Sequence, residues 1–185
     1  MIQKELANKK EFMEQLEIMK IDVFKDRIFV FTPQGDVIDL PEGATPIDFA
    51  FSVHTDIGLH CLTAKVNGQV VPLNTPLGSG DKVHIVTNPH QKPNHSWLEF
   101  AKTTKAHQAI RRWLKEEQYD HSVRLGRDIL DRELKRYRSD GPVDLDEIAA
   151  EVGLTDAEQL YAGLGSGDLS VGKIVGKFIP HKPKR

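Results

Sequence analysis

Histidine and cysteine side chains are the first candidates for catalysis or metal binding in this sequence. The chain has eight histidines and a single cysteine. His60 and Cys61 are adjacent at the start of a predicted strand, so their side chains should leave opposite faces and not converge on one ion. Cys61 could pair with a histidine as a nucleophile, but its strand position favours a small buried thiol. We therefore expect no catalytic residue, no metal site and no cofactor.

Two glycine-rich segments differ from the loops that bind nucleotide phosphates. Residues 78–82 contain glycines and a lysine, but not at the spacing of a Gly-x-x-x-x-Gly-Lys-Ser/Thr loop. Residues 163–167 do not follow a predicted strand, so we interpret them as a helix end followed by a flexible connection. Neither segment indicates a nucleotide-binding enzyme.

Basic residues are concentrated in the middle of the chain. Residues 1–88 carry 8 basic and 12 acidic residues, residues 89–138 carry 12 and 7, and residues 139–185 carry 5 and 8. The net charge of −2 is therefore an average over unlike segments. A solvated helix face is the common explanation of such a cluster, and a polyanion partner is the other. One face of a helix predicted over residues 104–117 holds Lys105, Gln108, Arg112 and Lys115, with Arg111 at its edge.

The first half of the chain predicts a small domain with one helix on a mixed sheet. Thr45, Pro46 and Asp48 are residue types that begin a helix, and Asn67-Gly68 is typical of a tight hairpin. A helix laid across a sheet buries the apolar face of each, which describes a ubiquitin-like β-grasp domain. The predicted elements are a helix at 4–19, strands at 28–32 and 37–40, a helix at 45–54, and strands at 61–66, 70–71 and 82–87.

The second half predicts an all-α domain. Pro89 and Pro93 mark a linker, and Ser96 is a candidate N-cap for the turn after it. Helical periodicity then covers 104–117, 122–137, 144–152, 156–164 and 170–178, with a break at 140–142. The expected class is α+β: a short N-terminal helix at 1–26, the β-grasp domain at 27–88, the linker at 89–95, and a helical domain with a basic tail at 96–185.

The sequence indicates a cytoplasmic protein without a membrane partner. No apolar run approaches the roughly 18–20 residues that a membrane span needs. The first residues lack the apolar core of a signal peptide. A single cysteine excludes an internal disulfide and is consistent with a reducing compartment.

Several segments of the first half resemble a TGS domain, and several of the second half resemble the helical domain of the long RelA/SpoT (Rel) proteins, which synthesise and hydrolyse (p)ppGpp. The first set is Val30-Phe31-Thr32-Pro33-Gln34-Gly35, Leu40-Pro41-Glu42-Gly43-Ala44-Thr45, Val53-His54-Thr55, Ala64-Lys65-Val66-Asn67-Gly68 and Gly80-Asp81-Lys82-Val83. The second set is Ser96-Trp97-Leu98, Ile110-Arg111-Arg112-Trp113, Gly126-Arg127-Asp128 and Gly167-Asp168-Leu169-Ser170. Residues 1–26 resemble the end of a synthetase domain and its linker, so the resemblance covers essentially the whole chain.

The resemblance implies a non-catalytic regulatory segment of a larger enzyme. In that family the TGS and helical domains belong to the half that senses uncharged tRNA in the ribosomal A site during the stringent response. The match at Val53-His54-Thr55 implies that His54 contacts the 3′ CCA end of deacylated tRNA. The synthetase and hydrolase centres would lie outside this chain, and the parent is expected to be a GTP diphosphokinase (GTP pyrophosphokinase), a (p)ppGpp hydrolase, or both.

One position departs from the family pattern. Many relatives read Gly-His-Arg-Cys where this chain has Gly58-Leu59-His60-Cys61, so a phosphate contact by an arginine is not expected at position 60. Charge and position alone nominate further phosphate contacts at Lys65, Lys105, Arg111, Arg112 and Lys115.

A second hypothesis is a protein-interaction module. The β-grasp domain would then bind an acyl carrier protein or the enzyme's own catalytic half. A third hypothesis, catalysis by Cys61 or the histidines, has the least support.

Overall fold

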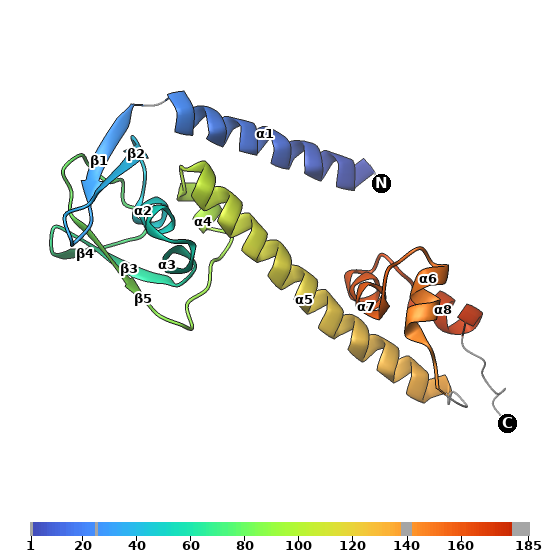
Figure 1. The fold of residues 1–185 in the computed structure, drawn as a ribbon. Coiled ribbons are helices and arrows are strands. Elements are labelled where there is room, and N and C mark those ends of the chain that lie inside the picture. Colours follow the sequence, from blue (N-terminus) through green and yellow to red (C-terminus); the bar gives the residue numbers. More distant parts are fainter. Residues whose placement is uncertain (1, 25, 138–141, 179–185) are drawn as a thin grey trace. The chain divides into compact units, whose positions relative to one another are not determined.

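A computed structural model describes residues 2–24, 26–137 and 142–178 (Figure 1). They group into two compact units, Met1–Leu114 and Lys115–Arg185, which we describe separately. The predicted α+β class is confirmed: an N-terminal helix and a small β-grasp-like sheet domain precede a helical region. The predicted break at 140–141 and the basic tail from residue 180 lie outside the described residues. No helix among those described is both long and apolar enough to cross a membrane.

Helix α1 (Ile2–Phe24) is longer than the predicted 4–19. Its sequence contains no glycine or proline, so nothing local ends it earlier. Phe12, Leu16 and Met19, which gave the helical period, are exposed.

Five strands form the β-grasp domain as a two-stranded and a three-stranded sheet, and all were predicted to within one or two residues. Strands β1 (Arg27–Phe31) and β2 (Val37–Pro41) make an antiparallel hairpin, and β3 (Cys61–Val66) pairs with both β4 (Gln69–Val71) and β5 (Val83–Thr87). A parallel bridge between Phe31 and Lys82 connects the two groups. Asn67 and Gly68 have positive φ angles of 53° and 84°, as a tight hairpin turn requires.

Helix α2 (Pro46–Val53) lies against one face of the strands and is followed at once by α3 (Thr55–Leu59) (Figure 1). It begins where the sequence predicted, because the Asp48 carboxylate accepts hydrogen bonds from the backbone amide and the hydroxyl of Thr45. One core lies between α2 and the sheet, and its buried residues are Ile28, Val30, Leu40, Ala44, Phe49, Leu77 and Val83.

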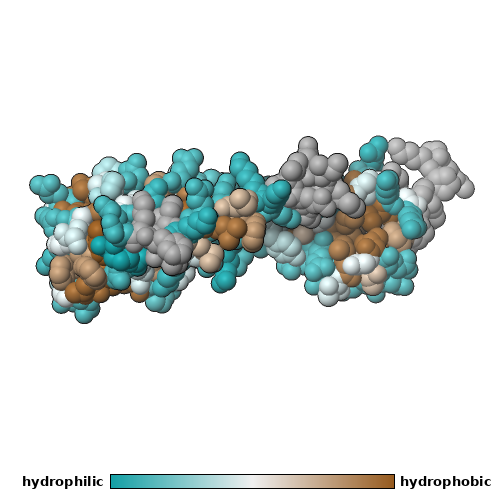
Figure 2. All heavy atoms as spheres, turned by 90° about the horizontal axis from the view of Figure 1, so that it is seen from above, coloured by the Kyte–Doolittle hydropathy of each residue, from teal (hydrophilic) through white to brown (hydrophobic). Residues whose placement is uncertain are grey.

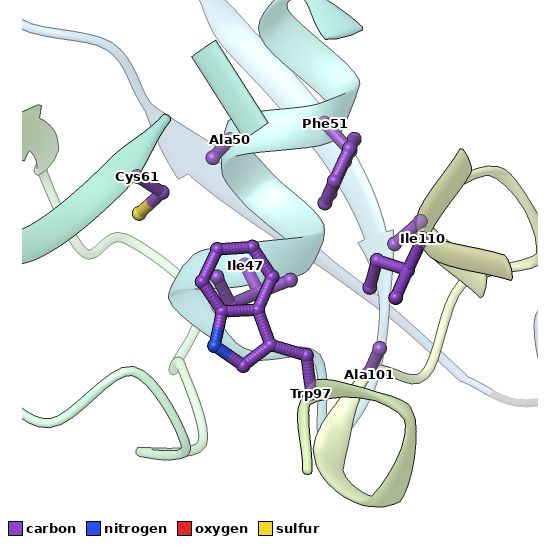
Figure 3. Packing of buried hydrophobic residues seen from close by; sticks show 8 residues of the cluster. Ile47, Ala50, Phe51, Cys61, Trp97, Ala101 and Ile110 are labelled. Carbon is purple, nitrogen blue, oxygen red and sulfur yellow. The ribbon is translucent and has the colours of Figure 1, made fainter. Parts of the chain in front are cut away.

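A second core joins α2 to the segment that follows the β-grasp strands. Figure 3 shows Trp97 from α4 (Trp97–Phe100) beside Ile47, with Cys61 and Phe51 nearby. Ala50, Ala101, Ala106 and Ile110 complete this buried cluster. Packing therefore continues across residues 89–95, and the domain division placed there stays a prediction.

Ser96 does not cap α4, which corrects the prediction. Its backbone is already helical, with φ of −65° and ψ of −23°, and its hydroxyl donates to the Asn94 side-chain oxygen. A residue with helical dihedrals does not aim its side chain at the first free amides of the helix.

Helix α5 (Thr104–Tyr137) is one helix of 34 residues. The prediction of two helices, ending near 117 and restarting near 122, is therefore wrong. Residues 118–121 read Gln-Tyr-Asp-His and contain neither glycine nor proline. The apolar periodicity of these residues is weak, but weak periodicity does not by itself end a helix. Each of the four residues keeps the backbone N–H that a helix needs.

Three short helices, all predicted, pack with the later part of α5 in the second unit. They are α6 (Leu145–Glu151), α7 (Ala157–Ser166) and α8 (Val171–Phe178). Asp144 and Asp156 cap α6 and α7 by accepting hydrogen bonds from backbone amides, and Gly167 ends α7 with φ of 85°. The buried core of this unit is Leu130, Ile148, Ala149, Leu160, Leu164, Ile174 and Val175.

Two glycines bring α5 and α7 into backbone contact. A Cβ placed on Gly126 would lie 1.7 Å from the Tyr161 carbonyl oxygen, and one on Gly165 would lie 1.8 Å from the Ser122 carbonyl oxygen. Gly126 of α5 thus faces Tyr161, which lies four residues before Gly165. Gly165 of α7 faces Ser122, which lies four residues before Gly126. The glycine cluster at 163–167 therefore ends a helix, as predicted, but Gly163 and Gly165 lie inside α7 and are not a flexible connection.

Candidate nucleic-acid interface

His54 lies at the junction of α2 and α3. Its extended backbone, with φ of −163° and ψ of 144°, interrupts the helical path between the two helices. The His54 amide donates to the Ala50 carbonyl of α2, and its carbonyl accepts from the Gly58 amide of α3. The backbone is therefore fixed on both sides while the side chain remains 64% exposed.

The His54 ring is held in one orientation. Nδ1 accepts a hydrogen bond of 3.1 Å from the Asp56 amide, so Nδ1 carries the lone pair and the neutral ring carries its hydrogen on Nε2. The Asp56 carboxylate lies 3.8 Å from Nδ1. An exposed Nε2–H can donate to a hydroxyl or a base nitrogen, and the ring face can stack on a base.

Lys65 is not on the same side of the β-grasp domain as His54. It lies on β3 between Val70 of β4 and His84 of β5, and its side chain is exposed. Its neighbour Ala64 points the other way, into the buried side of the sheet that α2 covers. The structure therefore does not bring Lys65 together with His54, which stands at the end of α2.

The basic face of α5 is present as predicted. Lys105, Gln108 and Arg112 are exposed, whereas Ala106 and Ile110 are fully buried against the second core. This face belongs to the same compact unit as His54. Lys115 is also exposed on α5, but it belongs to the second unit, where it lines a groove with Gln118, Gln159 and Asp168.

Arg111 is engaged by helix α1 and is only partly exposed to solvent. Its guanidinium lies 2.6 Å from Glu14 and 3.6 Å from Glu11, and only 15% of its side chain is exposed. Its Nε donates to Nδ1 of buried His107, whose Nε2 donates to the Leu98 carbonyl. Burial lowers the pKa of His107, and the Arg111 charge acts in the same direction. A phosphate contact by Arg111 would have to replace two carboxylates.

His60 and Cys61 have structural surroundings. Nδ1 of His60 donates to the Gln91 carbonyl at 3.0 Å, and the His60 carbonyl accepts from the Asn88 amide, so this histidine holds the start of the linker. Cys61 is fully buried, and burial raises the pKa of its thiol to about 12. Sequence reasoning predicted the buried thiol but missed the contact of His60. Among the described residues no three His, Cys, Asp or Glu side chains could hold a metal.

Comparison with known families agrees with this architecture. Residues 28–87 match the TGS domain, and residues 113–179 match the RelA/SpoT AH domain. The first match spans all five strands with α2 and α3, and the second spans the later part of α5 and α6 to α8.

Curated relatives align with nearly the whole chain. A GTP pyrophosphokinase of Myxococcus xanthus is 40% identical over an alignment 185 positions long, which covers 97% of this chain and 24% of that protein. The bifunctional (p)ppGpp synthase/hydrolase SpoT of Escherichia coli is 42% identical over 171 residues, which are 91% of this chain and 24% of that protein. The chain thus spans about a quarter of the length of these relatives. The chain therefore holds a TGS domain followed by the helical AH domain that is named for the RelA/SpoT proteins.

Proposed function

We propose that this chain is a non-catalytic regulatory segment of a RelA/SpoT-type enzyme and senses the 3′ CCA end of deacylated tRNA on the ribosome. The observation that carries the proposal is the geometry of His54 within a TGS domain. Its backbone is fixed between two helices, its ring accepts a hydrogen bond from the Asp56 amide through Nδ1, and its side chain is 64% exposed. The parent protein would be a (p)ppGpp synthetase, hydrolase or both, as the names of its relatives indicate.

The chemistry of the tRNA end explains why such a histidine can discriminate. A free terminal adenosine presents ribose hydroxyls that accept a hydrogen bond from Nε2–H and a base that can stack on the imidazole. An amino acid esterified to that ribose removes one hydroxyl and adds bulk and a positive charge. A donor placed against the free ribose therefore favours the deacylated form. The exposed Lys105 and Arg112 would add contacts to phosphates that are the same in both forms.

Titration with deacylated and aminoacylated tRNA at two salt concentrations tests the proposal. We expect the wild-type chain to bind the deacylated form at least about tenfold more tightly, which corresponds to about 1.4 kcal/mol. His54→Glu should abolish this preference, because the carboxylate lacks the donor and repels phosphate. The same titrations are repeated in the presence of ribosomes with an empty A site.

His90→Glu is the matched control. His90 is also an exposed histidine of the first unit, so the change in charge is the same. It should weaken binding of both tRNA forms equally or not at all. Equal binding of both forms by the wild type, or a preference that persists in His54→Glu, would refute the role of His54.

An exposed apolar face supports a second candidate, the protein-interaction module. Phe29, Phe31, Val37 and Val70 on the outer face of the strands are 50%, 36%, 55% and 65% exposed. Strand register places Val37 beside Phe31. In the view of Figure 2, brown apolar patches lie among teal polar residues at the surface. Such a face fits a partner such as an acyl carrier protein or the catalytic half of the parent. Protein binding that depends on Phe31, together with equal binding of both tRNA forms, would favour this candidate.

A further inference from the structure

Asp48 is a fully buried carboxylate that contacts two separate segments of the first unit. Oδ2 accepts from the amide and hydroxyl of Thr45, at the start of α2, at 2.9 and 3.1 Å. Oδ1 accepts from the amide and hydroxyl of Thr103 at 2.9 and 3.0 Å, and the Lys102 amide donates to both oxygens. Sequence alone explained only the first set, as a helix N-terminal carboxylate. The second set reaches across more than fifty positions of sequence.

The partners of Asp48 are backbone amides and threonine hydroxyls, so its carboxylate is held by directed hydrogen bonds. Burial raises the pKa of Asp48 above its usual 3.8, while hydrogen bonds from Thr45, Thr103 and Lys102 oppose that rise. An amide side chain could not replace the carboxylate. Whichever oxygen position received the NH₂ of asparagine, that group would face at least two backbone N–H donors, which leaves buried donors unpaired.

The contact continues directly into α5. The Thr103 hydroxyl, which donates to Asp48, also accepts from the Ala106 amide in the first turn of α5. Helix α5 packs on α2 through Ala106, three residues after Thr103, and Ile110. These two residues lie on the side of α5 opposite its basic face. On the other side, α2 runs from Asp48 to the junction that holds His54. One carboxylate thus connects the element that carries His54 with the element that carries Lys105 and Arg112.

We propose that Asp48 is a positioning residue. It fixes the start of α5 against α2 and so fixes the position of His54 relative to the basic face of α5. The functional part of this inference rests on the proposed recognition of tRNA. With α2 and α5 held in this fixed arrangement, the TGS domain and the helix after its linker can contact one RNA end together. Removing the carboxylate should release the start of α5 while the strands keep their own ladder and core.

Hydrogen exchange of the full chain tests the structural part. In Asp48→Asn the amides of Lys102 and Thr103 should exchange at least about tenfold faster, whereas amides of β3 and β5 keep their rates. Asp36→Asn is the matched control, because it removes the same charge from an exposed position. Unchanged exchange at Lys102 and Thr103, or an equal increase throughout the strands, would overturn the proposal.

Thr103 supplies a second variant should Asp48→Asn fail to fold. Thr103→Val has the same shape without the hydroxyl, and Thr103→Ser keeps the hydroxyl. Loss of the helix cap alone would speed exchange only at Ala106. Loss of the contact with Asp48 should also speed exchange at Lys102, and Thr103→Ser should restore the wild-type rates. A Thr103→Val protein that differs only at Ala106 contradicts the proposal.

The salt dependence of tRNA binding tests the functional part. Each phosphate contact contributes about 0.7–0.9 to the slope of log K against log salt. Asp48→Asn should lower this slope by about one or more while the preference for deacylated tRNA is kept, since α2 and His54 remain in place. A purely structural role would leave the slope of the folded protein unchanged and would overturn the positioning role. If the wild type shows no preference at all, the proposed function fails, and the exchange measurement still decides whether Asp48 fixes α5.

Discussion

Gly126→Ala and Gly165→Ala should each remove a large part of the stability of the second unit. The new Cβ would lie less than 2 Å from a backbone carbonyl oxygen of the facing helix, Tyr161 for the first and Ser122 for the second. A backbone oxygen cannot rotate away as a side chain can, so α5 and α7 must separate. Overpacking of this kind costs about 3 kcal/mol or more. A domain of this size is stabilised by only about 4–10 kcal/mol in total.

Hydrogen exchange across α6 to α8 measures this effect, and tryptophan fluorescence provides an internal reference. Both tryptophans, Trp97 and Trp113, belong to the first unit, so their signal reports on that unit. Gly176→Ala in α8 is the matched control because nothing lies within 4 Å of its added Cβ. It should be neutral or stabilising by up to about 1 kcal/mol through helix propensity. Native exchange in Gly126→Ala would show that α5 and α7 do not cross this closely.

Gly58→Ala should destabilise the first unit by about 1–3 kcal/mol. The added Cβ would lie 2.4 Å from the ring of Phe51, which is fully buried in the second core. Because that ring has no space to move into, α3 must shift away from α2. A loss of 1 kcal/mol lowers the midpoint of thermal unfolding by about 4–8 °C in a domain of this size. Circular dichroism or tryptophan fluorescence measures the shift.

The same substitution should also disturb His54, because the Gly58 amide donates to the His54 carbonyl. Gly58→Ala protein that is still folded should therefore prefer deacylated tRNA less than the wild type does. Gly78→Ala is the control in the same unit, since the atom nearest to its added Cβ is Asp81 Oδ2 at an ordinary 3.5 Å. A Gly58→Ala protein with wild-type stability would contradict the packing of Gly58 on Phe51.

Local signals in the sequence were sufficient for most elements. The strand pairs and α2 were predicted because hairpin glycines, helix caps and alternating apolar residues act within a few positions. The extent of α5 was missed, because an irregular apolar pattern at 118–121 resembles a helix break when no packing partner is known. The roles of Gly126 and Gly165 depend on a helix that lies elsewhere in the sequence. Glycine alone does not distinguish a close crossing from a turn.

The residues of the candidate site also divide into those whose surroundings could be predicted from the sequence and those whose surroundings could not. His54 was predicted from a family motif, and its exposure and fixed ring orientation agree with a binding role. Charge alone nominated Lys65, which lies on the outer face of the sheet, and Arg111, which is engaged by Glu11 and Glu14. The role of Asp48 could not be predicted, because two of its three partner residues, Lys102 and Thr103, lie beyond the linker. Long-range polar contacts leave no periodic signal in sequence.

Photocrosslinking shows which residues of the chain contact the 3′ end of tRNA. Deacylated tRNA that carries a photoreactive adenosine at its 3′ terminus is bound to the chain, irradiated, and the modified peptide is identified by mass spectrometry. We predict a crosslink within residues 51–60, which hold the end of α2, His54 and α3, and its loss when the tRNA is aminoacylated. A crosslink confined to the outer face of the sheet, near Phe31 or Lys65, or one of equal yield with both tRNA forms, would contradict the account.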